Sequence, residues 1–134
     1  MRKKIMIANV LFLSAVFTIS MTGKHSLTDD WAVPEKYTKM KNPYAEAKDS
    51  EQIGKRLYAV HCKSCHGTKG LGDGSKAAEL KTKMPDFTAT EFKSQTDGVL
   101  YYKTYIGKDE MPAFDKKISE AEDQWLLVNY IKSL

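Results

Sequence analysis

The feature that most constrains this chain is the segment Cys62-Lys63-Ser64-Cys65-His66, which holds both cysteines of the 134-residue sequence. The two thiols are three positions apart, and a histidine directly follows the second one. A helical pattern precedes the segment, so both thiols come at the end of a helix. Four glycines follow between residues 67 and 74, which is typical of a loop and not of a strand or a helix.

The pattern Cys-x-x-Cys-His predicts covalent attachment of a c-type haem. Each thiol can add across one vinyl group of the porphyrin to form a thioether, which then holds His66 under the iron as an axial ligand. About 110 residues with three modest helices contain too few Leu, Ile and Val side chains to fill a core. We therefore expect one covalent haem c, held by Cys62 and Cys65, to complete the interior.

Three other uses of the two cysteines stay open at this point. A thiol–disulfide centre normally opens a helix after a strand, and no strand pattern precedes Cys62. A zinc site would need adjacent residues of the same segment, such as His61 and Cys62, to bind one tetrahedral ion. An inert structural disulfide is the third alternative. Each of them explains fewer of the neighbouring features than haem attachment does.

The first 23 residues have the order of an export signal. Three basic residues at positions 2–4 precede a mostly apolar run over residues 5–19. This run is somewhat shorter than the roughly 20 apolar residues of a membrane-spanning helix. We therefore expect residues 1–23 to be a signal peptide that is removed, with a retained membrane anchor through residues 5–21 as the alternative. A removed signal peptide and a retained anchor both predict that the rest of the chain lies in the periplasm or on the outer face of the cytoplasmic membrane.

The composition excludes several classes of protein. Hydrophobic residues make up 42% of the chain and charged residues 28%, which fits neither a disordered polyelectrolyte nor a multi-span membrane protein. The formal net charge is +4, but three of the 21 basic residues lie in the export segment. Residues 24–134 therefore carry 18 basic and all 17 acidic residues, a net charge of +1. Such a nearly neutral body has no general electrostatic attraction for nucleic acid.

Residues 24–49 form an N-terminal arm between the export segment and the domain. Pro34 and Pro43 break any long helix here, so we expect the arm to be extended or to form short helical turns. Its aromatic side chains either lie on the surface of the domain or belong to a plain linker, and the sequence supports both interpretations.

Residues 50–134 are expected to form one helical domain. Helical patterns begin at Ser50, cover about residues 97–106, and run from a capping box, Ser119 with Glu122, to the C-terminus. No segment shows the period-two alternation of a strand. The prediction is an all-α fold of three to five short helices and long loops, wrapped around one covalently bound haem.

A second axial ligand has to come from outside the cysteine segment. His25 lies beside the export segment and His61 precedes the first cysteine, so neither is well placed opposite His66. Met84 and Met111 are both followed by proline, which stiffens a loop. Met84 belongs to the loop on the histidine side, whereas Met111 lies between two later helices, where a loop can cross to the other face. We therefore predict that Met111 binds the iron and that Met84 is a packing residue.

The sequence over roughly residues 50–134 resembles class I (monohaem) cytochromes c of the bacterial exported type. The likeness rests on the Cys-x-x-Cys-His segment with its glycines, on residues 105–114 around Met111, and on a pair of helices. In this family the first and last helices cross at a small residue, with aromatic contacts across the crossing. The residues at the matching spacing are Gly54, Tyr58, Leu127 and Tyr130.

The resemblance implies a cytochrome c-like fold and one-electron transfer, not enzymatic catalysis. It implies that Cys62 and Cys65 form the haem thioethers, and that His66 and Met111 are the axial ligands of the iron. It further implies that the backbone carbonyl of Pro85 accepts a hydrogen bond from Nδ1–H of His66, which would fix the imidazole ring and strengthen it as a donor to the iron.

Two roles fit such a protein and share the same site. One is an electron carrier in a bacterial periplasmic respiratory chain, and the other is a haem subunit that works only when docked in a larger membrane respiratory complex. An enzyme acting on peroxide, nitrite or oxygen needs an open axial position, which His/Met ligation does not leave. The expected partners are redox proteins or a respiratory complex, without nucleic acid, and with a membrane tether if residues 5–21 are retained.

Lysines lie in and near the haem-related segments. They form either a basic ring that attracts an acidic redox partner or ordinary solvated surface, because acidic residues are interspersed with them. These lysines are Lys63, Lys69, Lys81, Lys83, Lys108, Lys116 and Lys117.

Overall fold

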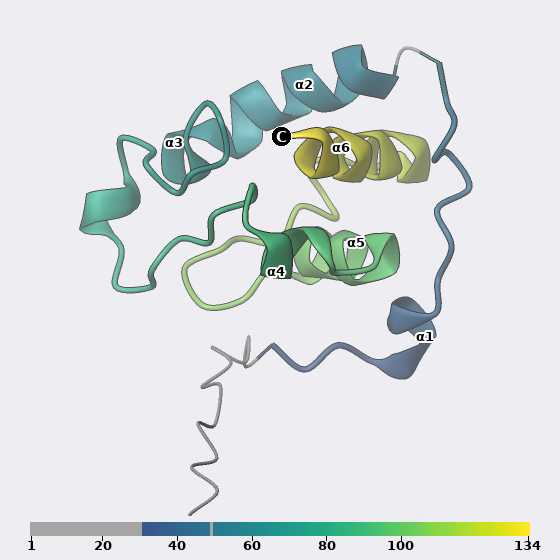
Figure 1. The fold of residues 1–134 in the computed structure, drawn as a ribbon, viewed down its shortest axis with the longest axis horizontal. Coiled ribbons are helices and arrows are strands. Elements are labelled where there is room, and N and C mark those ends of the chain that lie inside the picture. The colour runs from purple at the N-terminus through teal and green to yellow at the C-terminus, as the bar shows by residue number, and fades with distance from the viewer. Residues whose placement is uncertain (1–30, 49) are drawn as a thin grey trace, which may run out of the picture. The chain divides into compact units, whose positions relative to one another are not determined.

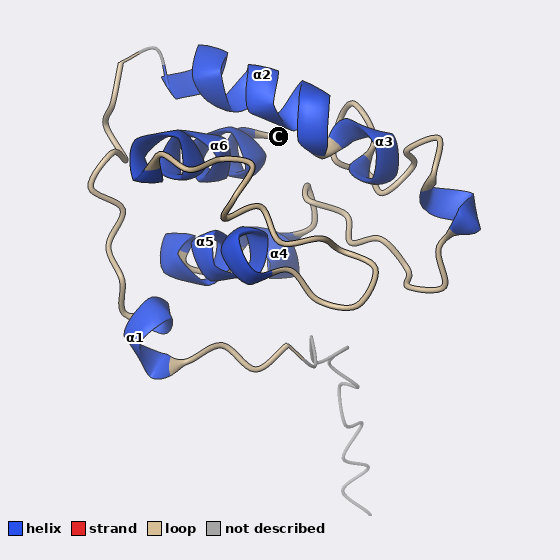
Figure 2. Cartoon of the chain, turned by 180° about the vertical axis from the view of Figure 1, so that it is seen from behind, coloured by secondary structure: helices blue, strands red, loops and turns tan. Residues whose placement is uncertain are grey.

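The computed structural model describes residues 31–48 and 50–134, and these contain helices but no strand (Figures 1 and 2). The predictions for residues 1–30, including the export segment and His25, lie outside the described residues. The elements are α1 Glu35–Thr38, α2 Ser50–His61, α3 Lys63–His66, the 3₁₀-helix η1 Ala77–Glu79, α4 Thr90–Lys93, α5 Asp97–Ile106 and α6 Ala121–Ser133. The all-α prediction is confirmed. This part of the chain contains six α-helices, whereas three to five were expected. The number is higher because α1, α3 and α4, which are single turns of four residues each, count as helices.

The first long helix, α2, crosses α6 at Gly54. A Cβ atom at this position would collide with the carbonyl oxygen of Leu126 and would lie 2.7 Å from Cβ of Tyr130. The absence of a side chain therefore lets the two backbones touch. One turn further along α2, the ring of Tyr58 lies 5.3 Å from that of Tyr130. Both views show α2 and α6 side by side, and the predicted helix crossing is confirmed.

Helix α6 is the most buried element among the described residues, because α2 packs on one side of it and α5 on another. Four consecutive residues, 125–128, are buried, and Val128 is fully enclosed. A helix that is apolar around most of its circumference is stable only inside a protein. The sequence of α6 thus requires two packing partners, and α2 and α5 supply them.

The capping box predicted at the start of α6 is wrong. The N-cap residue is Glu120, and it makes no side-chain capping bond. Ser119 lies one residue before the cap and contacts the carboxylate of Glu120 at 3.5 Å. The start of the helix is set instead by Ile118, which is buried, and by Gln124, whose Nε2 donates to the Ile118 carbonyl at 2.6 Å.

The described part of the arm packs against the helical domain. Asn42 donates from Nδ2 to Oδ1 of Asn129 on α6 at 2.6 Å and to Oδ2 of Asp97 on α5 at 3.2 Å. The ring of Tyr37 lies 4.6 Å from that of Tyr102 on α5. The described arm therefore lies on the domain surface and is not a plain linker. None of the described helices combines the length and the apolar character needed to cross a bilayer.

We predict that Gly54→Ala destabilises the protein by about 1–3 kcal/mol, because the added methyl group forces α2 away from α6. Thermal unfolding followed by circular dichroism measures this loss. The control is Ala59→Leu, which adds more volume at an exposed position of the same helix and should change stability by less than about 0.5 kcal/mol. Equal losses of stability in the two variants would contradict the close contact between the α2 and α6 backbones at Gly54.

Candidate functional site

The cysteine segment lies where α2 ends and α3 begins. The main-chain N–H groups of Cys65 and His66 donate to the carbonyl of Cys62 at 3.2 and 2.9 Å, so one helical turn connects the three residues. Residues three positions apart on a helical turn lie on the same face. The backbone therefore presents both thiols to one side of the segment.

Cys62 is buried and Cys65 is half-buried, and no disulfide joins them. Burial, together with the charge of Cys65, raises the pKa of the Cys62 thiol to about 12. A thiol with such a pKa is protonated at neutral pH, whereas a zinc ligand or the attacking group of a thiol–disulfide centre is a thiolate. The described residues also include no group of three or more His, Cys, Asp or Glu side chains able to hold a metal ion. Both observations weigh against a thiol–disulfide centre and against a zinc site.

His66 is buried, and this burial lowers the pKa of its imidazole to about 4. The ring is therefore neutral at pH 7, which is the form of histidine that coordinates a metal. Its Nδ1 atom is enclosed and has no hydrogen-bond partner in the structure. A buried polar atom without a partner is unusual in a folded protein. The chain thus leaves Nδ1 without a hydrogen bond, and an iron atom would be bound by the other ring nitrogen, Nε2.

The hydrogen bond predicted from His66 to the Pro85 carbonyl is not present in the structure. Pro85 is exposed, and the residue that reaches the imidazole is Phe87, whose ring stacks on it with centroids 4.6 Å apart. Phe87 is held in place because its main-chain N–H donates to the carbonyl of Gly70 at 2.7 Å. The chain thus restrains the imidazole by ring stacking.

The glycine-rich loop folds back on α3. The main-chain N–H groups of Gly72 and Gly74 donate to the carbonyls of His66 and Cys65 at 2.9 and 3.2 Å. These are carbonyls at the C-terminal end of a helix, which lack partners within the helix itself. Gly67 adopts φ of +81°, a conformation that favours glycine. The loop therefore fixes the position of His66 through its backbone.

Met111 lies in a tight turn after α5. The main-chain N–H groups of Lys108 and Met111 each donate to the other residue's carbonyl at 2.9 Å. Gly107 precedes this turn with φ of +68°, and a Cβ atom there would lie 2.5 Å from the carbonyl oxygen of Met111 and from the N atom of Ala113. The turn can therefore pack this closely only because residue 107 has no side chain.

One apolar cluster brings the predicted site residues together. Cys62 and Phe87 are buried members, Met111 packs against the cluster, and His66 stacks on Phe87. The other buried members are Tyr58, Phe114, Ile118, Leu127 and Ile131. Cys65 is not part of this cluster, but it follows Cys62 by one helical turn. The chemistry of these groups, one thiol in the cluster and a second a turn away, a neutral imidazole and a thioether, fits a covalently held haem.

Two residues that we set aside as ligands, Met84 and His61, are among the described residues. Met84 lies beside Gly72, where an added Cβ would come within 3.0 Å of Cβ of Met84, as expected for a packing residue. His61 is the last residue of α2, and its ring packs on Phe114, a member of the apolar cluster, with centroids 5.7 Å apart.

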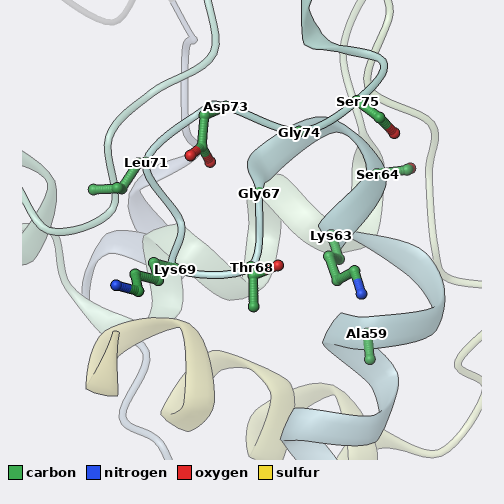
Figure 3. A pocket seen from close by; sticks show the side chains of 10 residues that line it. All are labelled: Ala59, Lys63, Ser64, Gly67, Thr68, Lys69, Leu71, Asp73, Gly74 and Ser75. Atoms are coloured by element: carbon green, nitrogen blue, oxygen red, sulfur yellow. The ribbon is translucent and has the colours of Figure 1, made fainter.

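A separate pocket of about 560 Å³ lies beside α3 (Figure 3). Its lining residues are Ala59, Lys63, Ser64, Gly67, Thr68, Lys69, Leu71, Asp73, Gly74 and Ser75. Cys62, His66 and Met111 are not among them. The pocket is therefore a surface feature outside the cluster that joins the predicted haem ligands.

Residues 51–134 match the protein-family model described as Cytochrome c, which covers well over half of the chain. The chain belongs to the cytochrome c family. Covalently bound haem c is the cofactor of this cytochrome, and the general role that follows is electron transfer. No curated protein matches the sequence.

Solved structures of c-type cytochromes resemble this cytochrome. A chain of the reducing HAO-like protein complex Kustc0457/Kustc0458 of Kuenenia stuttgartiensis is 27% identical, with a TM-score of 0.58, over 70% of this chain and 46% of that one. The cytochrome thus spans less than half of that neighbour. The KustC0563 c-type cytochrome is also 27% identical, with a TM-score of 0.50, over 60% of this chain and 94% of that one. Cytochrome CL of the marine methylotroph Methylophaga aminisulfidivorans shares the fold at 19% identity, with a TM-score of 0.51, over 81% of this chain and 71% of that one.

Sequence reasoning missed two residues of this cytochrome that act on the site. Phe87 restrains the imidazole, and an aromatic residue two positions after Pro85 in a polar loop was an available signal for it. Glu110 contacts a distant loop, as described below, and no local pattern in the sequence indicates such a contact.

The lysines named from the sequence lie at the surface, where exposed acidic residues such as Asp73, Asp86 and Asp109 accompany them.

We predict that Gly107→Ala displaces the Met111 turn, because the new methyl group meets the backbone on the far side of the turn and the left-handed φ costs about 1–2 kcal/mol. The expected result is lower thermal stability, together with weakening of the long-wavelength absorption that marks a thioether bound to ferric haem. Ala113→Ser, at an exposed position of the same turn, is the control and should change neither property. Unchanged spectra and stability in Gly107→Ala would show that the turn tolerates a side chain there.

Proposed function

We propose that this cytochrome is a one-electron carrier that works outside the cytoplasm, with His66 and Met111 as axial ligands of a haem held by Cys62 and Cys65. The observation that carries the proposal is the apolar cluster that joins three of these four residues: Cys62 is inside it, Met111 packs against it, and His66 stacks on one of its members. Residues from the end of α2 and from the turn after α5 meet there, although they are far apart in the sequence.

The bound haem supplies the redox chemistry, because its iron takes up and releases one electron. The chain's own residues set how easily this happens. His66 offers a neutral imidazole whose ring plane is restrained by Phe87. The soft thioether of Met111 favours the reduced state, and the apolar side chains around it exclude water and disfavour the extra positive charge of the oxidised state.

The ligand set also favours a carrier over an enzyme. His66 and Met111 would fill both axial positions, so peroxide, nitrite or oxygen would find no free site on the iron. Removal of the methionine thioether should open one position, and this difference supplies a direct test of the ligand assignment.

We predict that the reduced protein does not bind carbon monoxide at neutral pH, whereas Met111→Ala binds it readily and has a lower reduction potential. Visible spectra recorded before and after addition of the gas measure the binding. Met84→Ala is the matched control, because Met84 is the other methionine that precedes a proline. Its carbon monoxide binding should equal that of the unaltered protein. Binding that appears in Met84→Ala and not in Met111→Ala would assign the ligand to Met84.

The location outside the cytoplasm is supported by the order of residues 1–23, basic and then apolar. We predict that the protein, isolated from a host that attaches haem c, has the mass of a chain that begins near residue 24 plus one haem. Intact-mass measurement on the membrane and soluble fractions checks both points. A chain that keeps residues 1–23 and is found in the membrane fraction would instead support the anchor. A colourless chain with the mass of its amino acids alone would contradict the proposal.

A second candidate function is that of a haem subunit within a larger complex. The observation that favours it is the 27% identity to a chain of the HAO-like protein complex, of which this cytochrome spans less than half. Purification under mild conditions distinguishes the two roles: a subunit copurifies with other redox chains in fixed proportion, and a shuttling carrier is recovered alone.

A further inference from the structure

Glu110 connects the Met111 turn to a loop that lies 28 and 29 residues earlier in the sequence. Its carboxylate accepts a hydrogen bond from the main-chain N–H of Thr82 at 2.8 Å and another from that of Lys81 at 3.1 Å. The two bonds end on different carboxylate oxygens, so both oxygens are engaged at once. Hydrogen bonds to an ionised acceptor are stronger than those between neutral groups.

Few other main-chain hydrogen bonds hold the loop that Glu110 binds. Before it, the N–H of Leu80 donates to the carbonyl of Ala77, and after it the N–H of Phe87 donates to Gly70. Between them, over residues 81–85, the main-chain hydrogen bonds that the structure shows are the two to Glu110. The carboxylate is therefore the central attachment of this loop.

The Met111 turn depends on the same contact at its tip. Its internal bonds between Lys108 and Met111 are local and would move with the turn. Its two ends are fixed to the domain, at Gly107 by close packing and at Phe114, whose N–H donates to the carbonyl of Thr104 at 3.1 Å. Between these ends, Glu110 makes two hydrogen bonds to another segment.

The two segments joined in this way lead to the two sides of the predicted haem site. The loop over residues 81–85 continues to Phe87, which stacks on His66, and Glu110 directly precedes Met111. We propose that the Glu110 clasp, the Glu110 carboxylate with the main-chain N–H groups of Lys81 and Thr82, holds the Met111 turn closed and so slows the departure of Met111 from the iron. Glu110 is then a positioning residue, and the inference rests on the proposed His66/Met111 ligation.

The test uses the haem-loaded protein and three variants. Glu110→Ala removes the clasp, and Glu110→Gln keeps one oxygen acceptor without the charge. Asp109→Asn removes the same charge from the neighbouring position and is the matched control, because asparagine tolerates the positive φ of 52° found there. Two properties are measured: hydrogen exchange of the Lys81 and Thr82 amides in the reduced protein, and the limiting rate at which imidazole binds the oxidised protein, which is set by departure of the methionine.

We predict that Glu110→Ala speeds exchange of both amides and raises the limiting rate of imidazole binding about three- to tenfold, as loss of two exposed charge-assisted hydrogen bonds would. Glu110→Gln should give an intermediate rate, and Asp109→Asn should match the unaltered protein in both measurements.

Each contrary outcome has a separate meaning. If amide exchange is unchanged in Glu110→Ala, the clasp does not exist in solution. If exchange is faster but imidazole binds at the original rate, the clasp exists but does not control Met111, and the inference is overturned. If Asp109→Asn behaves like Glu110→Ala, the effect is one of charge and not of the clasp. If the unaltered protein lacks the absorption of thioether-bound haem, the proposed ligation fails first, whatever the variants show.

Discussion

The backbone contact between α2 and α6 at Gly54 determines where the site lies. Because α2 ends at the cysteine segment, the angle and depth at which it crosses α6 set the position of both thiols relative to the apolar cluster. Tyr58 extends the contact toward the site: its ring packs near Tyr130, and its hydroxyl donates to the carbonyl of Gly67 at 2.7 Å. Packing between two helices is thereby transmitted to the residue next to His66.

The interior that results combines apolar side chains with groups that can hold a cofactor. Its buried members are apolar or aromatic except for the Cys62 thiol, the Met111 thioether packs against them, and the His66 imidazole stacks on Phe87. These are the groups that would hold the covalent haem c of the family, so the cofactor and the core would share one apolar surface.

Sequence reasoning succeeded where the determining signal is local. The helix over residues 97–106 was placed correctly because Thr96 and Gly107 mark its two ends. The single-turn helices α3 and α4 were missed, since four residues show no periodicity, whereas α1 is one of the short helical turns expected in the arm. The capping box at Ser119 failed because burial of Ile118 fixes the chain just before it. Phe87 replaced Pro85 beside His66, and the Glu110 contact stayed invisible, because both depend on how loops distant in sequence meet in the fold.

The way the arm is attached has a mechanical consequence. Asn42 is hydrogen-bonded to both α5 and α6, and Asn129 in turn donates to the carbonyl of Tyr44 at 2.8 Å. A force applied to the N-terminal end of the chain therefore reaches these bonds before it reaches α2. The load is borne first by α5 and α6, so the arm acts as a brace across these two helices and does not pull directly on the segment that carries the cysteines.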